Sequence, residues 1–154
     1  MTINNKGYSL DSLSKYGLVS RSKGESFYDF FSDRLIFPIK NQKKEILGFG
    51  GRILNDQVPK YINTKKNLAF DKGAVLYGID QSVEYIRDND ECVLVEGYTD
   101  VIIAHQYGYK NVVASMGTAI TTQQASKIAD ISNNAIIALD ADQAGTEATL
   151  NALD

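Results

Sequence analysis

The second half of this 154-residue chain alternates short apolar runs with helix-like segments, and this limits its possible folds more than any other feature. Consecutive parallel strands need a crossover, usually a helix, and strands buried on both faces of a sheet are apolar throughout. The pattern therefore predicts a parallel sheet flanked by helices. The expected strands are residues 92–96, 111–115 and 135–140, and the expected helices are 80–87, 99–107, 121–131 and 144–153.

The first half predicts a small, mainly antiparallel β region. Two β-rich runs at 34–40 and 45–54 are separated by a turn at 41–44, and 58–63 is a third extended piece. The residues before 34 predict a short helix and a turn. The chain is therefore expected to be α/β, or α+β overall. Residues 1–78 form a small, basic, β-rich part of it and residues 79–154 form the α/β domain.

Three glycines interrupt the second β-rich run of this region, at Gly48, Gly50 and Gly51. Glycine in the interior of a strand weakens it, because it contributes no side chain to the packing. We therefore expect either a bulge at this point or a close approach by another backbone or by a ligand.

Three features of the sequence limit the class of protein: the length of its apolar runs, its single cysteine and its single histidine. No apolar run reaches about 18 residues, which excludes a transmembrane helix, and the N-terminus lacks the apolar stretch of a signal peptide. Cys92 is the single cysteine, and its place in an apolar run predicts a buried, inert thiol. The single histidine, His105, is expected on a helix face without a catalytic role. We expect a cytoplasmic protein with no membrane partner.

Charge is distributed unevenly along the chain. The net charge of −3 by itself argues against nucleic-acid binding. Residues 34–75 nevertheless carry nine basic and three acidic side chains, a net charge of +6, whereas residues 76–154 carry three basic and twelve acidic ones, a net charge of −9. This division is typical of a protein that binds phosphates with one part and metal ions with another. Two ordinary solvated faces would give the same totals.

Carboxylates follow two of the expected strands. Glu96 and Asp100 come after the run at 92–95, and Asp140 and Asp142 come at the end of the third strand. Ligands of open parallel sheets bind beyond the carboxyl ends of the strands, so the four acids converge if these strands are near neighbours. Like charges at such a distance raise each other's pKa values unless a counter-charge is present.

Mg²⁺ is the counter-ion that fits these four acids. It prefers a few carboxylates with waters and phosphates, and the sequence has no His/Cys set for zinc or softer metals. Such a site serves phosphoryl or nucleotidyl transfer, because the ion neutralises charge on phosphate oxygens. Gly97 and Gly145 would let the backbone approach a ligand. A single acid at a strand end would be interpreted as a helix cap, but Glu at one end with Asp-x-Asp at another favours the metal site.

Seven short motifs occur in order along the chain. They are RLIFPI at 34–39, GFGGR at 48–52, PKYIN at 59–63, LYG at 76–78, VEGYTD at 95–100, ASMGT at 114–118 and DADQAG at 140–145. The paired acids resemble the metal-binding motifs of the TOPRIM domain, the module shared by primases, topoisomerases and some nucleases. All seven motifs together resemble the catalytic core of bacterial DnaG-type DNA primases, over nearly the whole chain from about Gly7.

The resemblance implies a fold and an activity. A TOPRIM-type parallel sheet would follow a small antiparallel β subdomain, and the activity would be Mg²⁺- or Mn²⁺-dependent synthesis of short RNA primers on single-stranded DNA. Glu96 would be the central catalytic acid, and Asp100, Asp140 and Asp142 would complete the catalytic set. Glu96, Asp140 and Asp142 would be the metal ligands.

The resemblance also implies a binding surface in the basic region. Arg52, Lys60 and Tyr61 would bind nucleotide and template, and Arg34 and Tyr98 are further candidates for that surface. The residue types agree, because arginine binds phosphate through two parallel hydrogen bonds, lysine acts as a point charge and tyrosine offers a stacking face. For Tyr61, packing beneath the sheet is an equally open interpretation.

By the same resemblance, the partners are a single-stranded DNA template, ribonucleoside triphosphates and the RNA primer. The full-length protein would also bind the replicative helicase through a C-terminal region that is missing here. No zinc-binding cysteine/histidine set precedes the core, and the chain ends soon after Asp142, where such primases continue. We therefore expect either an excised piece or a short natural relative that binds Mg²⁺ and primes poorly alone.

Two rival interpretations share part of this pattern. A TOPRIM nuclease or topoisomerase piece has the acids but no use for the basic β region around Arg52 and Lys60, and a topoisomerase also needs a tyrosine nucleophile in a separate domain. A receiver-like, non-catalytic module also gathers acids around Mg²⁺. That class expects a lone phospho-accepting Asp and a Lys on a later strand, and no Lys follows Asp142.

Overall fold

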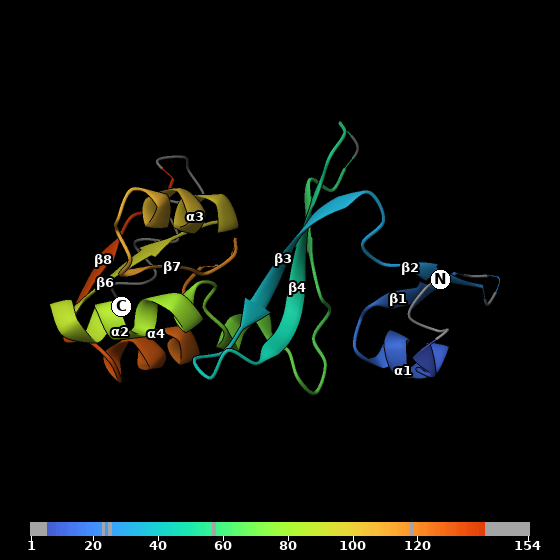
Figure 1. Cartoon of the computed structure of the whole chain (residues 1–154), viewed down its shortest axis with the longest axis horizontal. Coiled ribbons are helices and arrows are strands. Elements are labelled where there is room, and N and C mark those ends of the chain that lie inside the picture. The colour runs from blue at the N-terminus through green and yellow to red at the C-terminus, as the bar shows by residue number, and fades with distance from the viewer. Residues whose placement is uncertain (1–5, 23, 25, 57, 118, 141–154) are drawn as a thin grey trace. The chain divides into compact units, whose positions relative to one another are not determined.

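The chain forms two compact units (Figure 1). The computed structural model describes residues 6–22, 24, 26–56, 58–117 and 119–140. Unit 1 comprises Met1–Ile39 and Ile46–Asp71, and unit 2 comprises Lys40–Glu45 and Lys72–Asp154. The domain boundary expected after residue 78 stays a prediction. No helix among the described residues has the length and apolar character needed to cross a membrane.

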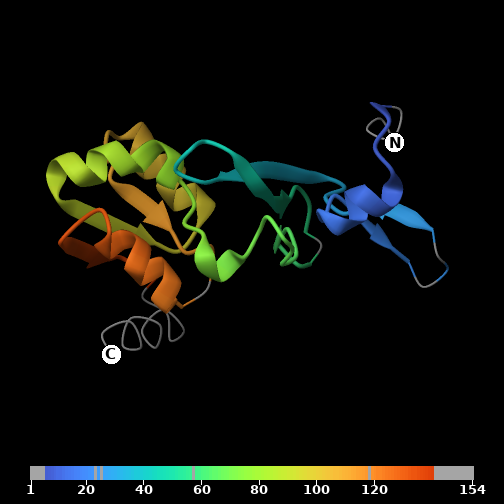
Figure 2. The same cartoon turned by 90° about the horizontal axis from the view of Figure 1, so that it is seen from below.

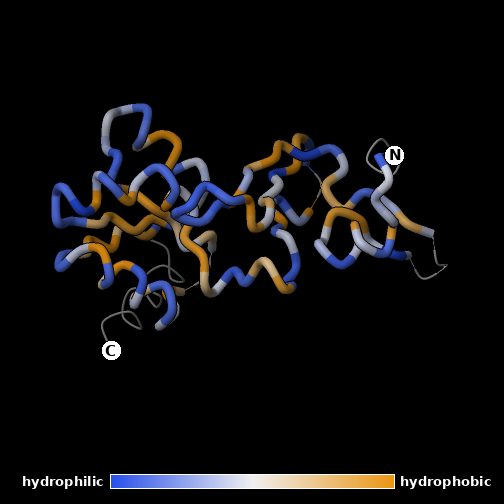
Figure 3. The backbone as a smooth tube through the Cα atoms, turned by 60° about the horizontal axis from the view of Figure 1, so that its bottom comes forward, coloured by the Kyte–Doolittle hydropathy of each residue, from blue (hydrophilic) through white to orange (hydrophobic). Residues whose placement is uncertain are grey.

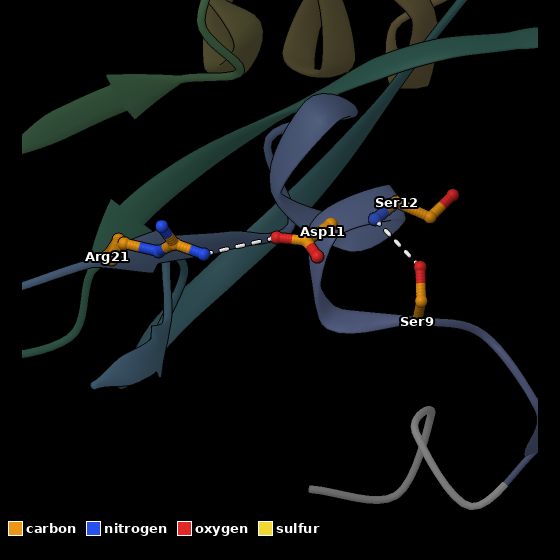
Figure 4. A network of polar contacts seen from close by, with 4 residues as sticks. All are labelled: Ser9, Asp11, Ser12 and Arg21. Atoms are coloured by element: carbon orange, nitrogen blue, oxygen red, sulfur yellow. Dashed lines mark hydrogen bonds and ion pairs between the residues drawn. The ribbon is translucent and has the colours of Figure 1, made fainter. Parts of the chain in front are cut away.

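Unit 1 starts with a short helix and a small hairpin. The Ser9 hydroxyl caps α1 (Leu10–Lys15) by accepting the Ser12 N–H at 3.1 Å (Figure 4). β1 (Val19–Arg21) and β2 (Phe27–Asp29) then pair antiparallel. The expected short helix is confirmed, but the hairpin was missed. Its strands have three residues each, which is too short for a period-two pattern to stand out.

A three-stranded sheet completes unit 1. The strand order is β3 (Arg34–Lys40), β4 (Ile46–Ile53) and β5 (Tyr61–Asn63), and β4 and β5 pair antiparallel. The turn at 41–44 is confirmed, with the Asn41 side chain accepting the N–H groups of Lys43 and Glu45 at 2.9 and 3.0 Å. The side chain thereby stabilises the turn together with two backbone bonds, from the Asn41 N–H to the Glu45 carbonyl at 3.1 Å and from the Lys44 N–H to the Asn41 carbonyl at 2.9 Å.

The glycines of β4 make room for aromatic rings. A Cβ atom on Gly48 would lie 2.9 Å from Cδ2 of Phe70, and one on Gly51 would lie 2.8 Å from Cδ1 of Phe31. At these two glycines the approaching groups are therefore side chains, and not the backbone or the ligand that the sequence led us to expect. A side chain at either position would therefore require the ring or the strand to shift.

Unit 2 is the expected parallel sheet with helices. The strand order is β7, β6, β8, and β6 pairs parallel with both neighbours. The expected helix at 144–153 lies outside the described residues. The elements in chain order are η2 (Lys72–Ala74), α2 (Ile79–Asn89), β6 (Glu91–Val95), α3 (Tyr98–Gln106), β7 (Val112–Ala114), α4 (Thr122–Ala129) and β8 (Asn134–Ile137).

Helices cover both faces of this sheet. Cys92 and Leu94 of β6 belong to a core cluster with residues of α2 and α4, whereas Val93 and Val95 pack with Val101 of α3. This alternation follows from the period of two along a strand. Figures 1 and 2 show α3 on one face and α2 and α4 on the other. Segments of hydrophobic residues run through the middle of the unit, and the residues of its outer loops are mainly hydrophilic (Figure 3).

The expectation that every strand is buried on both faces is wrong for β8. Ile136, in the middle of that strand, is 47% exposed, while Leu94 of neighbouring β6 is 1% exposed. Among the described residues β8 pairs only with β6, so within that part of the sheet it is an edge strand. An apolar run thus indicated the strand correctly but not its burial.

The single cysteine and the single histidine are both buried in unit 2. Cys92 has no exposed surface, and burial raises the pKa of its thiol to about 12, which confirms the expected buried thiol. His105 of α3 is 8% exposed, with Nε2 at 3.2 Å from Oγ of Ser82 and 3.0 Å from the Val112 carbonyl oxygen. These bonds connect α3 with α2 and β7, so His105 has a structural place in the core.

Candidate functional site

The carboxyl edge of the parallel sheet brings two of the expected acids together. β6 and β8 are direct neighbours, and the pairing continues past β8 through a 2.8 Å bond from the Ala138 N–H to the Leu94 carbonyl. Glu96 follows β6, and its Oε1 lies 3.4 Å from the backbone nitrogen of Asp140. Glu96 is half-buried and Asp140 is exposed. The condition set by the sequence, that these two strands lie side by side, is fulfilled.

Asp100 lies in the first turn of α3 and holds the turn that follows Glu96. Its Oδ2 accepts the Gly97 N–H at 2.9 Å, and Gly97 is the N-cap of α3. A carboxylate at this position satisfies a free N–H and interacts favourably with the helix dipole. The side chain itself is exposed. Asp100 thus fixes the backbone directly after Glu96.

A complete metal-ligand set is not found in the part of the chain that the structure describes. Among residues 6–22, 24, 26–56, 58–117 and 119–140, no three His, Cys, Asp or Glu side chains form a group that could hold a metal ion. Asp142, the third expected ligand, lies outside these residues. The donors that are described, Glu96 and Asp140, offer the hard oxygens that Mg²⁺ prefers, and in type they fit it.

Lys72 lies close to this edge, although the sequence motifs did not indicate it as a site residue. Its Nζ donates to the Gly117 carbonyl at 3.4 Å, and the Gly117 N–H donates to the Glu96 backbone carbonyl at 3.1 Å. The side chain is half-buried, and desolvation lowers the pKa of the Lys72 ammonium from its usual value. A cation whose charge is weakly solvated beside an acidic edge is a candidate for binding an anionic ligand.

The loop that contains Gly117, and through it contacts both Glu96 and Lys72, has an unusual backbone. Met116 and Gly117 both have positive φ values, 66° and 76°. Glycine adopts this conformation readily, but for Met116 it costs about 1–3 kcal/mol, and such strain is concentrated at functional sites. Both residues lie in the ASMGT motif. The presence of glycine at position 117 of this motif is explained by the positive φ that the turn requires there.

The position of Lys72 is fixed from α4. Gln124 is fully buried, and its Nε2 donates to the carbonyls of Lys72 and Val75 at 3.2 and 2.9 Å. Thr121, the N-cap of α4, donates its hydroxyl to the Gly73 carbonyl and accepts the Gln124 N–H. A threonine at the start of the helix expected at 121–131 predicts such a cap, and the cap also attaches η2 to the rest of unit 2.

Unit 1 carries a basic and aromatic cluster on β4 and β5. Arg52 and Tyr61 are direct cross-strand partners, and the Arg52 guanidinium lies 5.6 Å from the centre of the Tyr61 ring. Lys60 precedes β5, and its carbonyl accepts the Ile53 N–H at 2.9 Å. Arg52 and Lys60 line a cavity of about 480 Å³, and Tyr61 is 37% exposed.

Arg34 supports this cluster through the backbone. Its guanidinium donates to the Pro59 carbonyl at 3.0 and 3.1 Å, to the Lys60 carbonyl at 3.3 Å and to the Gly51 carbonyl at 3.4 Å. These bonds occupy several of its five N–H donors. Arg34 thus connects the start of β3 to the loop that presents Lys60.

Tyr98 lies in the interior of unit 2. The residue is 3% exposed, and its ring meets that of Tyr77 edge-on with centroids 4.7 Å apart. A ring in this position packs between α3 and the segment before α2. Its role as a nucleotide-binding residue stays a prediction from the motif, and the surface described for Arg52, Lys60 and Tyr61 belongs to unit 1.

Models of two protein families match the chain, in the order of the motifs. Residues 1–83 match the DNA primase catalytic core, N-terminal domain, and residues 90–154 match the Toprim domain. The first match covers the basic β region with Arg52 and Lys60, and the second covers the sheet edge with Glu96 and Asp140.

Individual relatives agree with these families. The DNA primase of Clostridium acetobutylicum is 44% identical over 149 residues, which are 97% of this chain and 25% of that protein. The RNA polymerase domain of Mycobacterium tuberculosis primase DnaG has a TM-score of 0.89 at 33% identity, over 99% of this chain and 52% of that one. A DnaG primase catalytic domain bound to ssDNA gives 0.88 and 34%, over 99% and 50%. The chain spans about a quarter of the length of its curated relatives.

Proposed function

Because this chain belongs to the DNA primase family, we propose that it forms part of an RNA polymerase that makes short primers on single-stranded DNA during replication. The reaction is nucleotidyl transfer between ribonucleoside triphosphates. The observation that carries the proposal is the position of Glu96 beside Asp140, at the carboxyl edge of a parallel sheet. The nuclease, topoisomerase and receiver-like alternatives are not favoured, because the curated relatives are DNA primases.

In this proposal the acidic edge of unit 2 holds Mg²⁺ or Mn²⁺. Glu96, Asp140 and Asp142 are the ligands, and Asp100 completes the catalytic set by fixing the turn after Glu96. When bound, the ion neutralises charge on the phosphates of the nucleotide. The cation of Lys72 supports the same task, since it can attract a triphosphate without adding a ligand to the metal.

Unit 1 supplies the template and nucleotide surface of the proposed polymerase. Arg52 and Lys60 bind phosphates, Tyr61 stacks on a base, and Arg34 holds the loop that carries Lys60. The proposed partners of the complete protein are single-stranded DNA, ribonucleoside triphosphates, the RNA primer and, through residues beyond this chain, the replicative helicase. Its proposed place of action is the cytoplasm, and the proposed domain division follows residue 78.

The metal site is tested by titrating Mn²⁺ into the chain. Replacing Asp140→Asn and Asp142→Asn together removes two charges while keeping side-chain shape, so we expect binding to weaken by at least tenfold. The matched control, Glu84→Gln with Asp88→Asn, removes two exposed charges from α2 and should leave binding unchanged. Equal affinities for the two double variants would contradict the metal site.

The nucleic-acid surface is tested with a fluorescent oligothymidylate at several salt concentrations. The slope of log K against log salt is negative, and each lost phosphate contact on a single strand should reduce its magnitude by about 0.7. We expect this loss for Arg52→Ala and for Lys60→Ala. Lys43→Ala, in the turn after β3, serves as the control of equal charge. Unchanged affinity and slope in the first two variants would rule out this surface as the phosphate site.

A further inference from the structure

Unit 1 contains a second cavity, distinct in its residues from the one beside Arg52. It has a volume of about 300 Å³, at the lower end of the range for ligand pockets. Three segments line it, namely the end of α1, the β1–β2 hairpin and the segment at 65–67 after β5. Its lining includes four cations and two aromatic rings, Lys15, Arg21, Lys65, Lys66, Tyr28 and Phe30, and no acidic residue.

The segments are brought together by a close approach at Gly17. This residue follows α1 with a φ of 74°, and a Cβ atom there would lie 3.1 Å from Cγ2 of Thr64 and 3.7 Å from the backbone nitrogen of Lys65. Thr64 is buried and bonded to Phe49 of β4 through both its hydroxyl and its backbone N–H. The end of α1 is therefore held against a segment that is itself fixed to the sheet.

Aromatic rings hold two of the cations in position. The Arg21 guanidinium lies 4.8 Å from the centre of the Phe27 ring, and the Lys65 ammonium lies 5.5 Å from that of Phe30. A cation placed over a ring loses less conformational freedom when an anion arrives, which favours binding. Tyr28 is 53% exposed and adds an accessible aromatic ring to the cavity wall.

The carboxylates near these cations leave a positive balance. Arg21 pairs with Asp11 at 3.1 Å, as Figure 4 shows, and Lys66 pairs with Asp71. Among the described residues, Lys15 and Lys65 make no ion pair, so two of the four positive charges are not matched. The Arg21 pair is also weak, because its side chains are 53% and 84% exposed. Arg21 can therefore exchange Asp11 for a stronger anion at little cost.

We propose that this cavity is a second phosphate-binding site of the protein. Its ligand is a phosphate group carried by a nucleoside, in a free nucleotide or within a nucleic-acid strand. Several cations around a small cavity bind a compact anion, and the hydroxyls of Ser14 and Ser20 can donate further bonds to its oxygens. The ring of Tyr28 suits a nucleoside better than inorganic phosphate, because a base can stack on it. If the phosphate belongs to a nucleic-acid strand, the proposal rests on the proposed function. If it belongs to a free nucleotide, it does not.

The test compares two pairs of lysines that carry the same charge. Lys15→Gln with Lys65→Gln removes the two unmatched charges of the cavity, and Lys43→Gln with Lys44→Gln removes two charges from the turn after β3. Inorganic phosphate, 5′-AMP and a short oligothymidylate are titrated against each variant of the full chain, with amide chemical shifts as the measure. Thermal unfolding of each variant verifies that the fold is kept.

We expect the cavity variant to bind a nucleoside phosphate about tenfold more weakly than the turn variant. For the oligothymidylate, the magnitude of the slope of log affinity against log salt should fall by about 1.4, or about 0.7 for each lost contact. If 5′-AMP shifts the amides around Lys15 and Lys65, the source is a free nucleotide. If only the oligothymidylate does so, the source is a strand.

The inference is overturned if the cavity and turn variants bind all three probes equally, or if no probe shifts the amides around Lys15 and Lys65. Neither result touches the proposed function, which depends on Arg52, Lys60 and the acidic edge. Conversely, Arg52→Ala could leave binding intact and so contradict the template surface while the lysine comparison still succeeds. The two proposals therefore fail separately.

Discussion

The two units position their functional side chains by different means. In unit 2, Glu96 and Asp140 stand near each other because each follows a strand and those strands are parallel neighbours. In unit 1, Arg52 and Tyr61 meet because antiparallel register makes them cross-strand partners. The parallel arrangement collects residues at one edge of a sheet, whereas the antiparallel one collects them on a face.

This difference determines which parts of each unit the site depends on. The acids of unit 2 rely on backbone topology and on a buried core that keeps the strands together. The cluster in unit 1 relies on side-chain contacts over a small sheet, including the bonds of Arg34 and the rings packed on Gly48 and Gly51. Substitutions in the core should therefore lower the stability of unit 2, and substitutions that crowd an aromatic ring should lower the stability of unit 1.

The largest effect is expected from Leu94→Ala in the core of unit 2. Leu94 is 1% exposed between α2 and α4, so its truncation leaves a cavity and should cost about 2–5 kcal/mol of unfolding free energy. Urea unfolding followed by circular dichroism measures this cost. Ile136→Ala on neighbouring β8 is the control, because a side chain that is 47% exposed should cost less than about 1 kcal/mol. Similar losses for both would show that the two strands share one core.

A smaller effect is expected from Gly48→Ala in unit 1. The new methyl group would lie 2.9 Å from Cδ2 of Phe70, so the ring or the strand must shift, at a cost of about 1–3 kcal/mol. Thermal unfolding should show a lowered midpoint. Gly24→Ala provides the control, since its nearest neighbour is 4.0 Å away and its midpoint should stay the same or rise slightly. An unchanged midpoint for Gly48→Ala would mean that the ring moves without cost.

The contrast between the units also explains what could be predicted from the sequence. Residue type and chain order were enough to expect acids at the edge of a parallel sheet, because topology constrains where strand ends lie. The bonds of Arg34 to the Pro59 carbonyl were not foreseeable, because they join positions 25 residues apart through side-chain geometry. Tyr98 lies in a recognisable motif, yet its burial against Tyr77 depends on packing that no local pattern encodes.

Lys72 was overlooked for a related reason. It lies in a short 3-10 turn without hydrophobic periodicity, and its relation to Glu96 arises only through the loop at Gly117. Its nearness to the LYG motif was the one available signal. Conversely, the cap of α4 could be read from the sequence, because a hydroxyl before a helix acts on N–H groups two or three residues away.

The smallest effect concerns Asp90, which joins two turns at the amino ends of β6 and β8. Its carboxylate accepts the Asn133 N–H at 2.8 Å and both Asn133 and Asn134 side-chain amides at 3.0 to 3.3 Å. These hydrogen bonds, those from Asn133 above all, hold the pKa of Asp90 below its usual value. A carboxylate whose pKa is lower in the folded state stabilises the fold above the unfolded pKa of about 3.9. That stability is lost as pH falls through the lower folded value.

Asp90→Asn isolates this charge, because asparagine also tolerates the left-handed backbone found here, with φ at 47°. The variant should have a lower urea midpoint than the wild type at pH 7, and the difference should close as the pH drops below about 3.9. Asp11→Asn is the counterpart in unit 1, where an exposed ion pair with Arg21 should contribute within about 0.5 kcal/mol. If the gap for Asp90→Asn stays constant with pH, the bonds to Asn133 act through shape alone and not through charge.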